Sequence, residues 1–402
     1  MRVASYGCRV VAVCPRGHML RHVTSISAFY SYSRLDSIGA LEAALKDAKP
    51  DLVIPCDDRV VWQMHEIHAR NPSLRPLIEF SLGAASAFEI VSSRERLLDL
   101  AKSLSIRIPE TRRVASEDDV AAWFGNTASS SAVLKLDGSW GGEGVEIVHS
   151  EQEGIEAFRR LAQTHGVGTA LKRSLVNRDP LAFWSWRRQS TPVITIQQFI
   201  AGRPANAMLA CWRGELLGML GVEVLSSQGA TGAANIVSFI DHAEIANAAQ
   251  LLTRQLGLTG FYGLDFMLET ATGSAWLIEM NPRCTQLGHL ARPDQMDLAG
   301  LLCMKLTDRA ITSSQAPIEE KTVAFFPQAI DWNPRSHFLR SGYHDVPWDE
   351  PQLVRELLQK PWPERQWLAR LYHHFRAPKK VTVIEFETVE SVGKVNGQPL
   401  NS

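Results

Sequence analysis

The sequence lacks the features that mark membrane-spanning and secreted proteins. No apolar run approaches the ~20 residues that a transmembrane helix requires, and the stretch from Met1 to Gly7 has neither the apolar core nor the cleavage site of a signal peptide. The charges are balanced, with 42 Lys plus Arg against 43 Asp plus Glu, so no global field favours nucleic acid or an anionic membrane. These absences predict a soluble cytoplasmic protein without nucleic-acid or membrane partners.

Cysteine is sparse, and its spacing argues against disulfide frameworks and structural zinc sites. The chain has six cysteines and no Cys-x-x-Cys pair. They are Cys8, Cys14, Cys56, Cys211, Cys284 and Cys303. Such scattering is typical of free thiols in a reducing compartment. The sequence also has no Gly-x-Gly-x-x-Gly after a predicted strand, which leaves a dinucleotide-dependent dehydrogenase as a distant alternative.

The chain of 402 residues is long enough for roughly two or three domains, each with a buried core. We place a first domain at residues 1–90 and a second at 91–312. Residues 313–402 form a C-terminal extension of mixed structure in which Pro and Trp recur. The expected fold class is therefore α/β (α+β), with more than one layer of helices and strands.

The first domain reads as strand, helix, strand. Residues 9–14 and 51–56 are short apolar runs, and residues 37–48 have helical spacing. This order predicts a parallel sheet of the doubly wound kind. The chain begins at what reads as the tail of a helix, so we expect this domain to lack its first strand. Asp57 and Asp58 follow at a strand's carboxyl end, where such sheets bind ligands, but capping of the next helix is the favoured interpretation.

The most informative feature is a pair of apolar strands on either side of a turn at Thr272. Pairing about this turn places Asp265 directly opposite Glu279, at the roughly 4.5–5.5 Å between Cβ atoms that cross-strand partners show. Asn281 lies two residues further on the same face, and Arg283 lies just beyond the strand end. Two carboxylates and an amide oxygen suit Mg²⁺ held jointly with phosphate oxygens. The alternative is a solvated outer face of an exposed hairpin.

A Gly-rich loop over residues 137–144 separates two other predicted strands, 132–136 and 145–148. No helix follows the loop, which distinguishes it from a dinucleotide fingerprint and from a Walker loop. Residues 171–191 are basic and contain Trp184 and Trp186 among their arginines and lysines. They could grip an anionic group, but a solvated surface insertion is the favoured interpretation.

The order of these features resembles the ATP-grasp superfamily, in particular the enzymes related to the carbamoyl-phosphate synthetase large chain and biotin carboxylase. The resemblance covers roughly residues 91–300, and residues 1–90 are similar to the smaller domain that precedes the grasp domain there. Its most specific part is the segment Leu-Ile-Glu-Met-Asn-Pro-Arg that ends at Arg283. It implies an ATP-grasp fold preceded by the parallel-sheet domain.

The resemblance implies a nucleotide site. Lys135 would contact the ATP phosphates. Arg94 stands at a helix start where the family often has Lys, with Arg96 as a second candidate for that position. Three flap glycines would let backbone amides close over the phosphates, namely Gly141, Gly142 and Gly144. The hinge that reads the adenine would consist of Gln198, Phe199 and Ile200. The family commonly begins this hinge with Glu, so the ribose partner is hard to place, and only Asn206 is a candidate.

The resemblance also implies a metal and catalytic centre. Asp265, Glu279 and Asn281 would hold Mg²⁺, or alternatively Mn²⁺. Arg283 would steady the transferring phosphoryl group by charge-assisted hydrogen bonds, so that Arg283 and Lys135 are the candidate catalytic residues. His289 could line the acceptor pocket, although a lone histidine is more often structural.

The activity implied is that of an ATP- and Mg²⁺-dependent ligase, which activates a carboxylate as an acyl-phosphate and joins it to an amine, releasing ADP and phosphate. Its partners would be a small-molecule carboxylate and amine, and a homodimer is compatible with the resemblance. A catalytically degenerate ATP-binding sensor is the alternative. A carboxylating or phosphorylating member of the superfamily is less favoured, because the chain has no Met-Lys-Met biotinyl motif and no second grasp copy.

Overall fold

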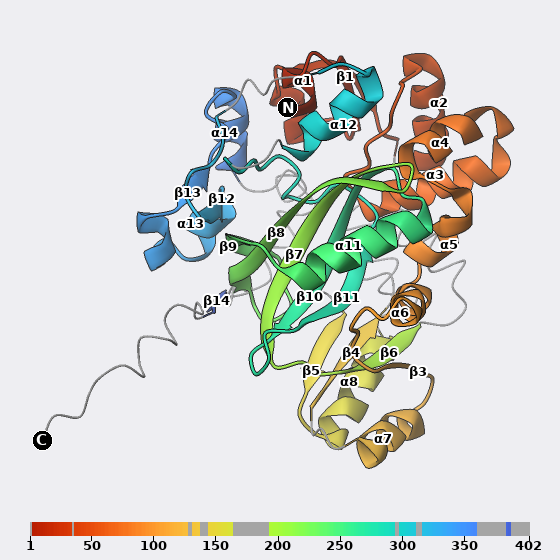
Figure 1. Ribbon diagram of the computed structural model, residues 1–402, viewed down its shortest axis with the longest axis vertical. Helices are drawn as coiled ribbons and strands as arrows, with labels where there is room; N and C mark the ends of the chain where they lie inside the picture. The colour runs from red at the N-terminus through yellow and green to blue at the C-terminus, as the bar shows by residue number, and fades with distance from the viewer. Residues whose placement is uncertain are drawn as a thin grey trace, which may run out of the picture.

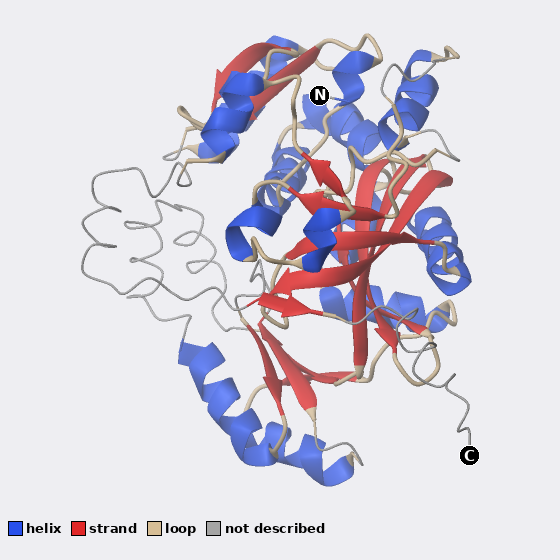
Figure 2. Ribbon diagram, turned by 90° about the vertical axis from the view of Figure 1, so that its left-hand side faces the viewer, coloured by secondary structure: helices blue, strands red, loops and turns tan. Residues whose placement is uncertain are grey.

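The computed structural model describes three sheets, with helices packed on them (Figures 1 and 2). The described residues are 2–33, 36–127, 131–136, 144–163, 193–293, 297–310, 316–359 and 383–386. Figure 2 shows the four-stranded antiparallel sheet below the large sheet, and the N-terminal helices above the large sheet. The mixed α/β class expected from the sequence is confirmed.

The N-terminal part holds a two-stranded parallel sheet and most of the early helices. Its strands are β1 (Val10–Cys14) and β2 (Ile26–Ser31), which pair in parallel. Its helical elements are α1 (Arg2–Ser5), η1 (Met19–His22), α2 (Ser37–Ala48), α3 (Asp58–Arg70), η2 (Pro72–Leu74), α4 (Arg75–Leu82), η3 (Ala85–Ala87) and α5 (Phe88–Val91). Of these, α2, α3, η2 and α4 supply a small core that includes Met64, Ile67 and Ile78.

The strand predicted over residues 51–56 is wrong. This run has no strand ladder, and the parallel partner of β1 is β2, which the sequence analysis missed. Its apolar side chains divide between two cores, because Leu52 and Ile54 pack on one cluster and Val53 on another. Its backbone finds partners outside a ladder: the Val53 N–H donates to Ser81 Oγ at 3.0 Å, and the Pro55 carbonyl accepts from Cys284 N at 2.9 Å.

The small antiparallel sheet has the strand order β3-β6-β4-β5. Its strands are β3 (Thr111–Val114), β4 (Ala132–Leu136), β5 (Val145–Val148) and β6 (Ile194–Gln198). The helices α7 (Glu117–Asn126) and α8 (Glu151–Gln163) supply its core, in which Trp123, Leu134 and Ile196 are at most 2% exposed. Helix α6 (Arg94–Ser103) precedes the first strand of this sheet in the chain. The strands predicted at residues 132–136 and 145–148 are confirmed.

The large sheet has the strand order β11-β10-β7-β8-β9-β12-β13, with β14 paired to β8. Its central strands are β7 (Gly202–Trp212), β8 (Glu215–Gln228), β9 (Ala234–Ile240), β10 (Gly260–Glu269) and β11 (Ala275–Asn281). The hairpin turn between β7 and β8 has positive φ at Arg213 (48°) and Gly214 (83°), the left-handed geometry that suits a two-residue turn between twisted strands.

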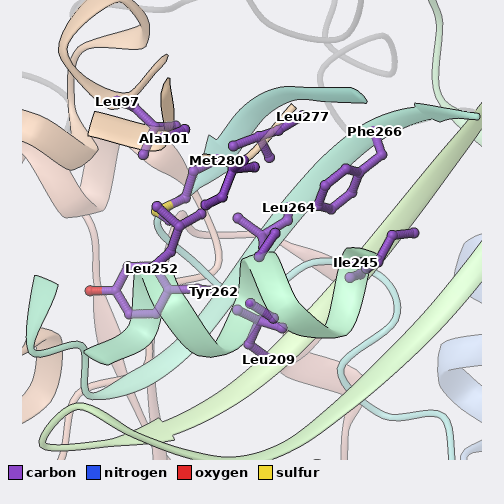
Figure 3. Packing of buried hydrophobic residues seen from close by; sticks show 14 of the residues in the cluster. Leu97, Ala101, Leu209, Ile245, Leu252, Tyr262, Leu264, Phe266, Leu277 and Met280 are labelled. Atoms are coloured by element: carbon purple, nitrogen blue, oxygen red, sulfur yellow. The ribbon is translucent and has the colours of Figure 1, made fainter. Parts of the chain in front are cut away.

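Helix α11 (Ala243–Leu256) lies across one face of the large sheet (Figure 1). It ends at Gly257, which takes a left-handed conformation that glycine adopts readily. Figure 3 shows Ile245 and Leu252 of this helix beside Leu209, Tyr262 and Leu264 of the sheet. Each of these side chains is at most 2% exposed, so α11 packs against the buried face of β10, one strand of the acidic hairpin.

The C-terminal residues add strands to the large sheet. Strand β12 (Thr322–Phe325) pairs antiparallel with β9 and parallel with β13 (Tyr343–Asp345), and β14 (Val383–Glu385) pairs with β8. The remaining elements are α12 (Leu298–Thr307), α13 (Gln328–Trp332), η4 (His337–Arg340) and α14 (Pro351–Leu357). Within the described ranges, no helix has the length and apolar character that crossing a bilayer requires.

Candidate active site

The acidic hairpin has the predicted register. Asp265 on β10 pairs with Glu279 on β11, and Gly263 pairs with Asn281. The register shifts by one residue just after Asp265, so Phe266 pairs with Leu277. Leu264 and Leu277 belong to the core under α11, so the alternation of side chains directs Asp265 to the opposite face of the sheet. The predicted convergence of two carboxylates is therefore confirmed.

Two amides hold the carboxylate of Asp265. Asn206 Nδ2 donates to Asp265 Oδ1 at 2.6 Å, and Asn281 Nδ2 donates to Asp265 Oδ2 at 3.0 Å. Asn206 reaches this position because β7 lies beside β10 and pairs it directly with Asp265. The sequence analysis considered Asn206 only as a ribose partner. The pairing of β7 with β10 joins residues 59 positions apart, and no local pattern in the sequence encodes it.

Positive charges from two other elements surround Glu279. Arg94, the first residue of α6, donates from Nη2 to Glu279 Oε2 at 2.8 Å. Lys135 comes from β4 of the small sheet and is 6% exposed. Burial tends to raise the pKa of Glu279, but the charges of Arg94 and Lys135 outweigh it and lower that pKa. The structure thus brings Lys135, Arg94 and Glu279 together, as the sequence analysis expects.

Asp265 titrates differently from Glu279. Burial and the neighbouring charge of Glu279 raise the pKa of Asp265 to about 7. Since like charges in contact disfavour double ionisation, the pair tends to retain one proton near neutral pH. A divalent cation between the carboxylates would replace that proton and relieve the repulsion.

The donor set fits Mg²⁺ or Mn²⁺. Carboxylate and amide oxygens are the hard ligands that these ions take, and Mg²⁺ usually keeps water or phosphate oxygens as well. The described residues contain no group of three or more His, Cys, Asp or Glu side chains that could hold a metal by themselves. Two carboxylates with the amide oxygen of Asn281 are therefore an incomplete cage, of the kind that phosphate oxygens complete.

Arg283 lies beside this cluster and also contacts the N-terminal part. Its Nε donates to Asp58 Oδ2 at 2.8 Å, and its Nη2 donates to Asn281 Oδ1 at 3.3 Å. Asp58 is the first residue of α3, and Asp57 caps that helix by accepting from Arg59 N at 2.8 Å. The capping interpretation of this Asp-Asp pair is confirmed for Asp57. The contact of Asp58 with Arg283 is a feature that the sequence analysis missed.

The predicted hinge residues connect the small antiparallel sheet to the large sheet. Gln198 ends β6 in the small sheet, and β7 of the large sheet begins at Gly202. Phe199 packs edge-on against His149, with ring centroids 6.3 Å apart, and Ile200 is 5% exposed. This position is where an adenine-reading hinge would lie, and the assignment stays a prediction.

The glycine flap is described only at its end. Gly144 has a positive φ of 87°, and its carbonyl accepts from Leu136 N at 2.8 Å, which closes the hairpin of β4 and β5. Gly141 and Gly142 lie outside the described residues, and so does the basic segment 171–191. His289, the candidate for the acceptor pocket, pairs with Asp345 at 2.8 Å.

Solved structures similar to this chain define its fold. The biotin carboxylase domain of 2-oxoglutarate carboxylase from Hydrogenobacter thermophilus, solved with MgADP and bicarbonate, matches with a TM-score of 0.55 at 12% identity over 78% of this chain and 68% of its own. The N5-carboxyaminoimidazole synthetase of Staphylococcus aureus, solved with ADP, matches with a TM-score of 0.54 at 12% identity over 77% and 75%. The chain therefore has the fold of the ATP-grasp superfamily.

A curated relative agrees with this fold. The carbamoyl phosphate synthase large chain of Thermus thermophilus is 23% identical over 257 residues, which are 63% of this chain and 23% of that protein. The chain thus spans about a quarter of the length of the curated relatives it matches. No protein-family model matches it. The recognition made from the sequence is confirmed at the level of the superfamily.

Proposed function

We propose that this protein is an ATP- and Mg²⁺-dependent ligase that joins a carboxylate to an amine and releases ADP and phosphate. The observation that carries the proposal is the acidic pair Asp265 and Glu279, with Arg94 at 2.8 Å from Glu279 and the buried Lys135 close by. The carboxylates on a solvated outer face of a hairpin would be hydrated by water and would not need positive side chains from α6 and β4 beside them. A site for Mg²⁺ and phosphate needs both signs of charge together.

Each residue of the site would have a separate task. Asp265, Glu279 and Asn281 would hold the metal, which would neutralise the phosphate charge and align it for transfer. Lys135 and Arg94 would bind phosphate oxygens, with backbone amides of the flap at Gly141, Gly142 and Gly144. Gln198, Phe199 and Ile200 would bind the adenine.

Arg283 would stabilise the charge that develops on the transferring phosphoryl group and then on the acyl-phosphate. Its guanidinium is already oriented by Asp58 and Asn281, so little reorganisation would be needed at the moment of reaction. The chemistry requires no protein nucleophile, because the substrate carboxylate attacks the γ-phosphorus and the amine then displaces phosphate. Closure of the flap would exclude the water that would otherwise hydrolyse the acyl-phosphate.

The test is ADP release by the purified protein with Mg-ATP, screened against pools of amino acids singly and in pairs. Release that depends on one acid and one amine would support the ligase and name its substrates. The Glu279→Gln variant should keep its fold and lose this release by at least ~100-fold, whereas the matched control Glu269→Gln, near the end of the same hairpin, should retain it. Undiminished release by Glu279→Gln would overturn the metal assignment.

Binding of Mg-ATP without release from any pool would instead favour the nucleotide-sensor alternative. Calorimetry with Mg-ATP makes this distinction. A nucleotide sensor would bind Mg-ATP without releasing ADP, whereas a protein without a nucleotide site would not bind it. We also propose that the protein acts in the cytoplasm on small molecules, with a homodimer as its candidate assembly. Light scattering at several protein concentrations would test that assembly.

A further inference from the structure

Two cysteines that are 295 positions apart in the chain bring their sulfur atoms together. Cys8 follows the short helix α1, and Cys303 lies in the middle of α12. Their Sγ atoms are 3.6 Å apart and share a hydrogen bond. Both cysteines carry free thiols. The candidate active site uses neither of them, so the proposed ligase chemistry does not account for this contact.

A packed interface holds the two segments together around this thiol pair. Asp297 caps α12 by accepting from Gly300 N at 2.8 Å, and its Oδ2 atom accepts from the hydroxyl of Tyr6. Arg2 Nη1 lies 3.8 Å from the same Oδ2 atom. The side chains of Val3 and Tyr6 pack on the apolar cluster to which α12 contributes. Polar and apolar contacts of the same two segments therefore keep the thiols in contact.

The distance between the sulfur atoms is short enough for a bond to form. An S–S bond is about 2.05 Å long, so the two atoms need to approach each other by a further ~1.5 Å. Cys303 belongs to a helix of 10 residues that packs on the large sheet, so its backbone is fixed. Cys8 follows a helix of only four residues and a turn at Gly7, where φ is 79°. Rotation about the Cα–Cβ bonds and a small shift of Cys8 supply the approach.

The two thiols differ in access and in how firmly they hold a proton. Cys8 is half-buried and in reach of solvent, whereas Cys303 is 2% exposed. Burial raises the pKa of Cys303 to about 12, and the neighbouring thiol of Cys8 adds to this effect. The thiolate is the form of cysteine that attacks an oxidant. Cys8 is therefore placed to react first, and Cys303 is placed to close the bond.

We propose that Cys8 and Cys303 form an oxidation site, which reacts with a hydroperoxide and closes to a disulfide. The thiolate of Cys8 attacks one oxygen of hydrogen peroxide and breaks the O–O bond, which gives a sulfenic acid at Cys8 and a hydroxide that is protonated to water. The sulfur of Cys303 then attacks the sulfur of Cys8, loses its proton and expels the sulfenic oxygen as a second water. Two thiols are thereby oxidised to one disulfide, and the peroxide is reduced to two waters.

The crosslink fixes a segment that also supports the loop after Arg283. Arg2, in the helix before Cys8, donates from Nε to the carbonyl of His289 in that loop at 2.7 Å. In the chain-entropy account, a disulfide stabilises the folded state by restricting the unfolded chain, and more so for a longer loop. This one joins residues 295 positions apart. The oxidised protein should therefore have a higher Tm than the reduced protein.

The experiment exposes the full chain to an equimolar amount of hydrogen peroxide, alkylates the remaining thiols and maps the peptides without reduction. The wild type should yield a Cys8–Cys303 crosslink within one chain, and dithiothreitol should reverse both the crosslink and the rise in Tm. Cys8→Ser should oxidise Cys303 at least ~10-fold more slowly. Cys303→Ser should stop at a sulfenic acid at Cys8, which dimedone traps. The control Cys56→Ser, which removes an exposed thiol, should retain the crosslink.

Two results with the wild type would overturn the proposal. One is that Cys8 passes to the sulfinic acid, or stays reduced, while Cys303 remains a thiol. The other is that Cys8 forms its crosslink with a different cysteine or with a second chain in preference to Cys303. The wild-type peptide map decides both, even if a serine variant fails to fold. The readout is covalent and independent of ligase activity, so this inference and the proposed function can fail separately.

Discussion

Asp58 Oδ2 accepts a hydrogen bond at 2.8 Å from Nε of Arg283, a residue 225 positions later in the chain. The contact joins the first turn of α3 to the loop after β11, and it orients the guanidinium that also contacts Asn281. Because both side chains are only about a quarter exposed, at 25% and 24%, the pair is partly shielded from solvent screening. The N-terminal part thereby takes part in building the candidate active site.

Replacing Asp58 by Asn should lower the turnover number of the ligase about 10-fold, with little change in the KM for ATP. The physical reason is that a neutral amide holds the guanidinium of Arg283 less firmly in the orientation that phosphoryl transfer requires. Steady-state kinetics of ADP release measures both constants. The control is the neighbouring Asp57→Asn variant, which alters the cap of α3 and the ion pair of Asp57 with Arg59. Equal losses in the two variants would refute the role of Asp58.

Replacing Arg94 by Gln should lower the free energy of unfolding by about 0.5–1 kcal/mol in the absence of Mg²⁺, since it removes the guanidinium that pairs with the carboxylate of Glu279. Added Mg²⁺ should then raise the Tm of this variant more than that of the wild type, because the cation no longer competes with a guanidinium. Differential scanning fluorimetry with and without MgCl₂ tests this. Arg96→Gln, in the same helix turn but paired with the exposed Glu89, should behave as wild type.

Replacing Asp265 by Asn should stabilise the metal-free protein above neutral pH. The folded-state pKa is about 7 against the ordinary 3.8, so the carboxyl ionises in the unfolded chain well before it does so in the folded one. Folding stability therefore falls as the pH rises through the window between these two values, and the loss is complete above it. Denaturation in EDTA should show the variant more stable than the wild type at pH 8 and not at pH 4.

Leu264 supports the site from the other face of the sheet, where it is fully buried beside α11 (Figure 3). Leu264→Ala should lower the free energy of unfolding by about 2–5 kcal/mol through the lost burial and the cavity that remains. Met267 lies on the same strand and is only partly buried, so Met267→Ala should cost less than about 1.5 kcal/mol. Urea titrations of the two variants give the comparison, and similar losses would contradict the assigned core.

Local sequence patterns predicted the structure correctly where it depends on residues that are close together in the chain. The helix at residues 37–48, the end of α11 at Gly257 and the pairing of Asp265 with Glu279 all follow from apolar spacing, a glycine or a short turn. The prediction of a strand at residues 51–56 failed, because an apolar run that divides its side chains between two cores looks the same in sequence as a buried strand. The domain boundaries near residues 90 and 312 stay a prediction.

The sequence by itself determined the hairpin that brings two carboxylates together and the ATP-grasp resemblance that its residues carry. Only the tertiary structure decided what surrounds those carboxylates, namely Asn206 from β7, Arg94 from α6, and Arg283 with its partner Asp58. The reason is physical. A hairpin register depends on one short turn, whereas contacts between distant segments depend on how whole layers pack, and no short pattern of residues encodes that packing.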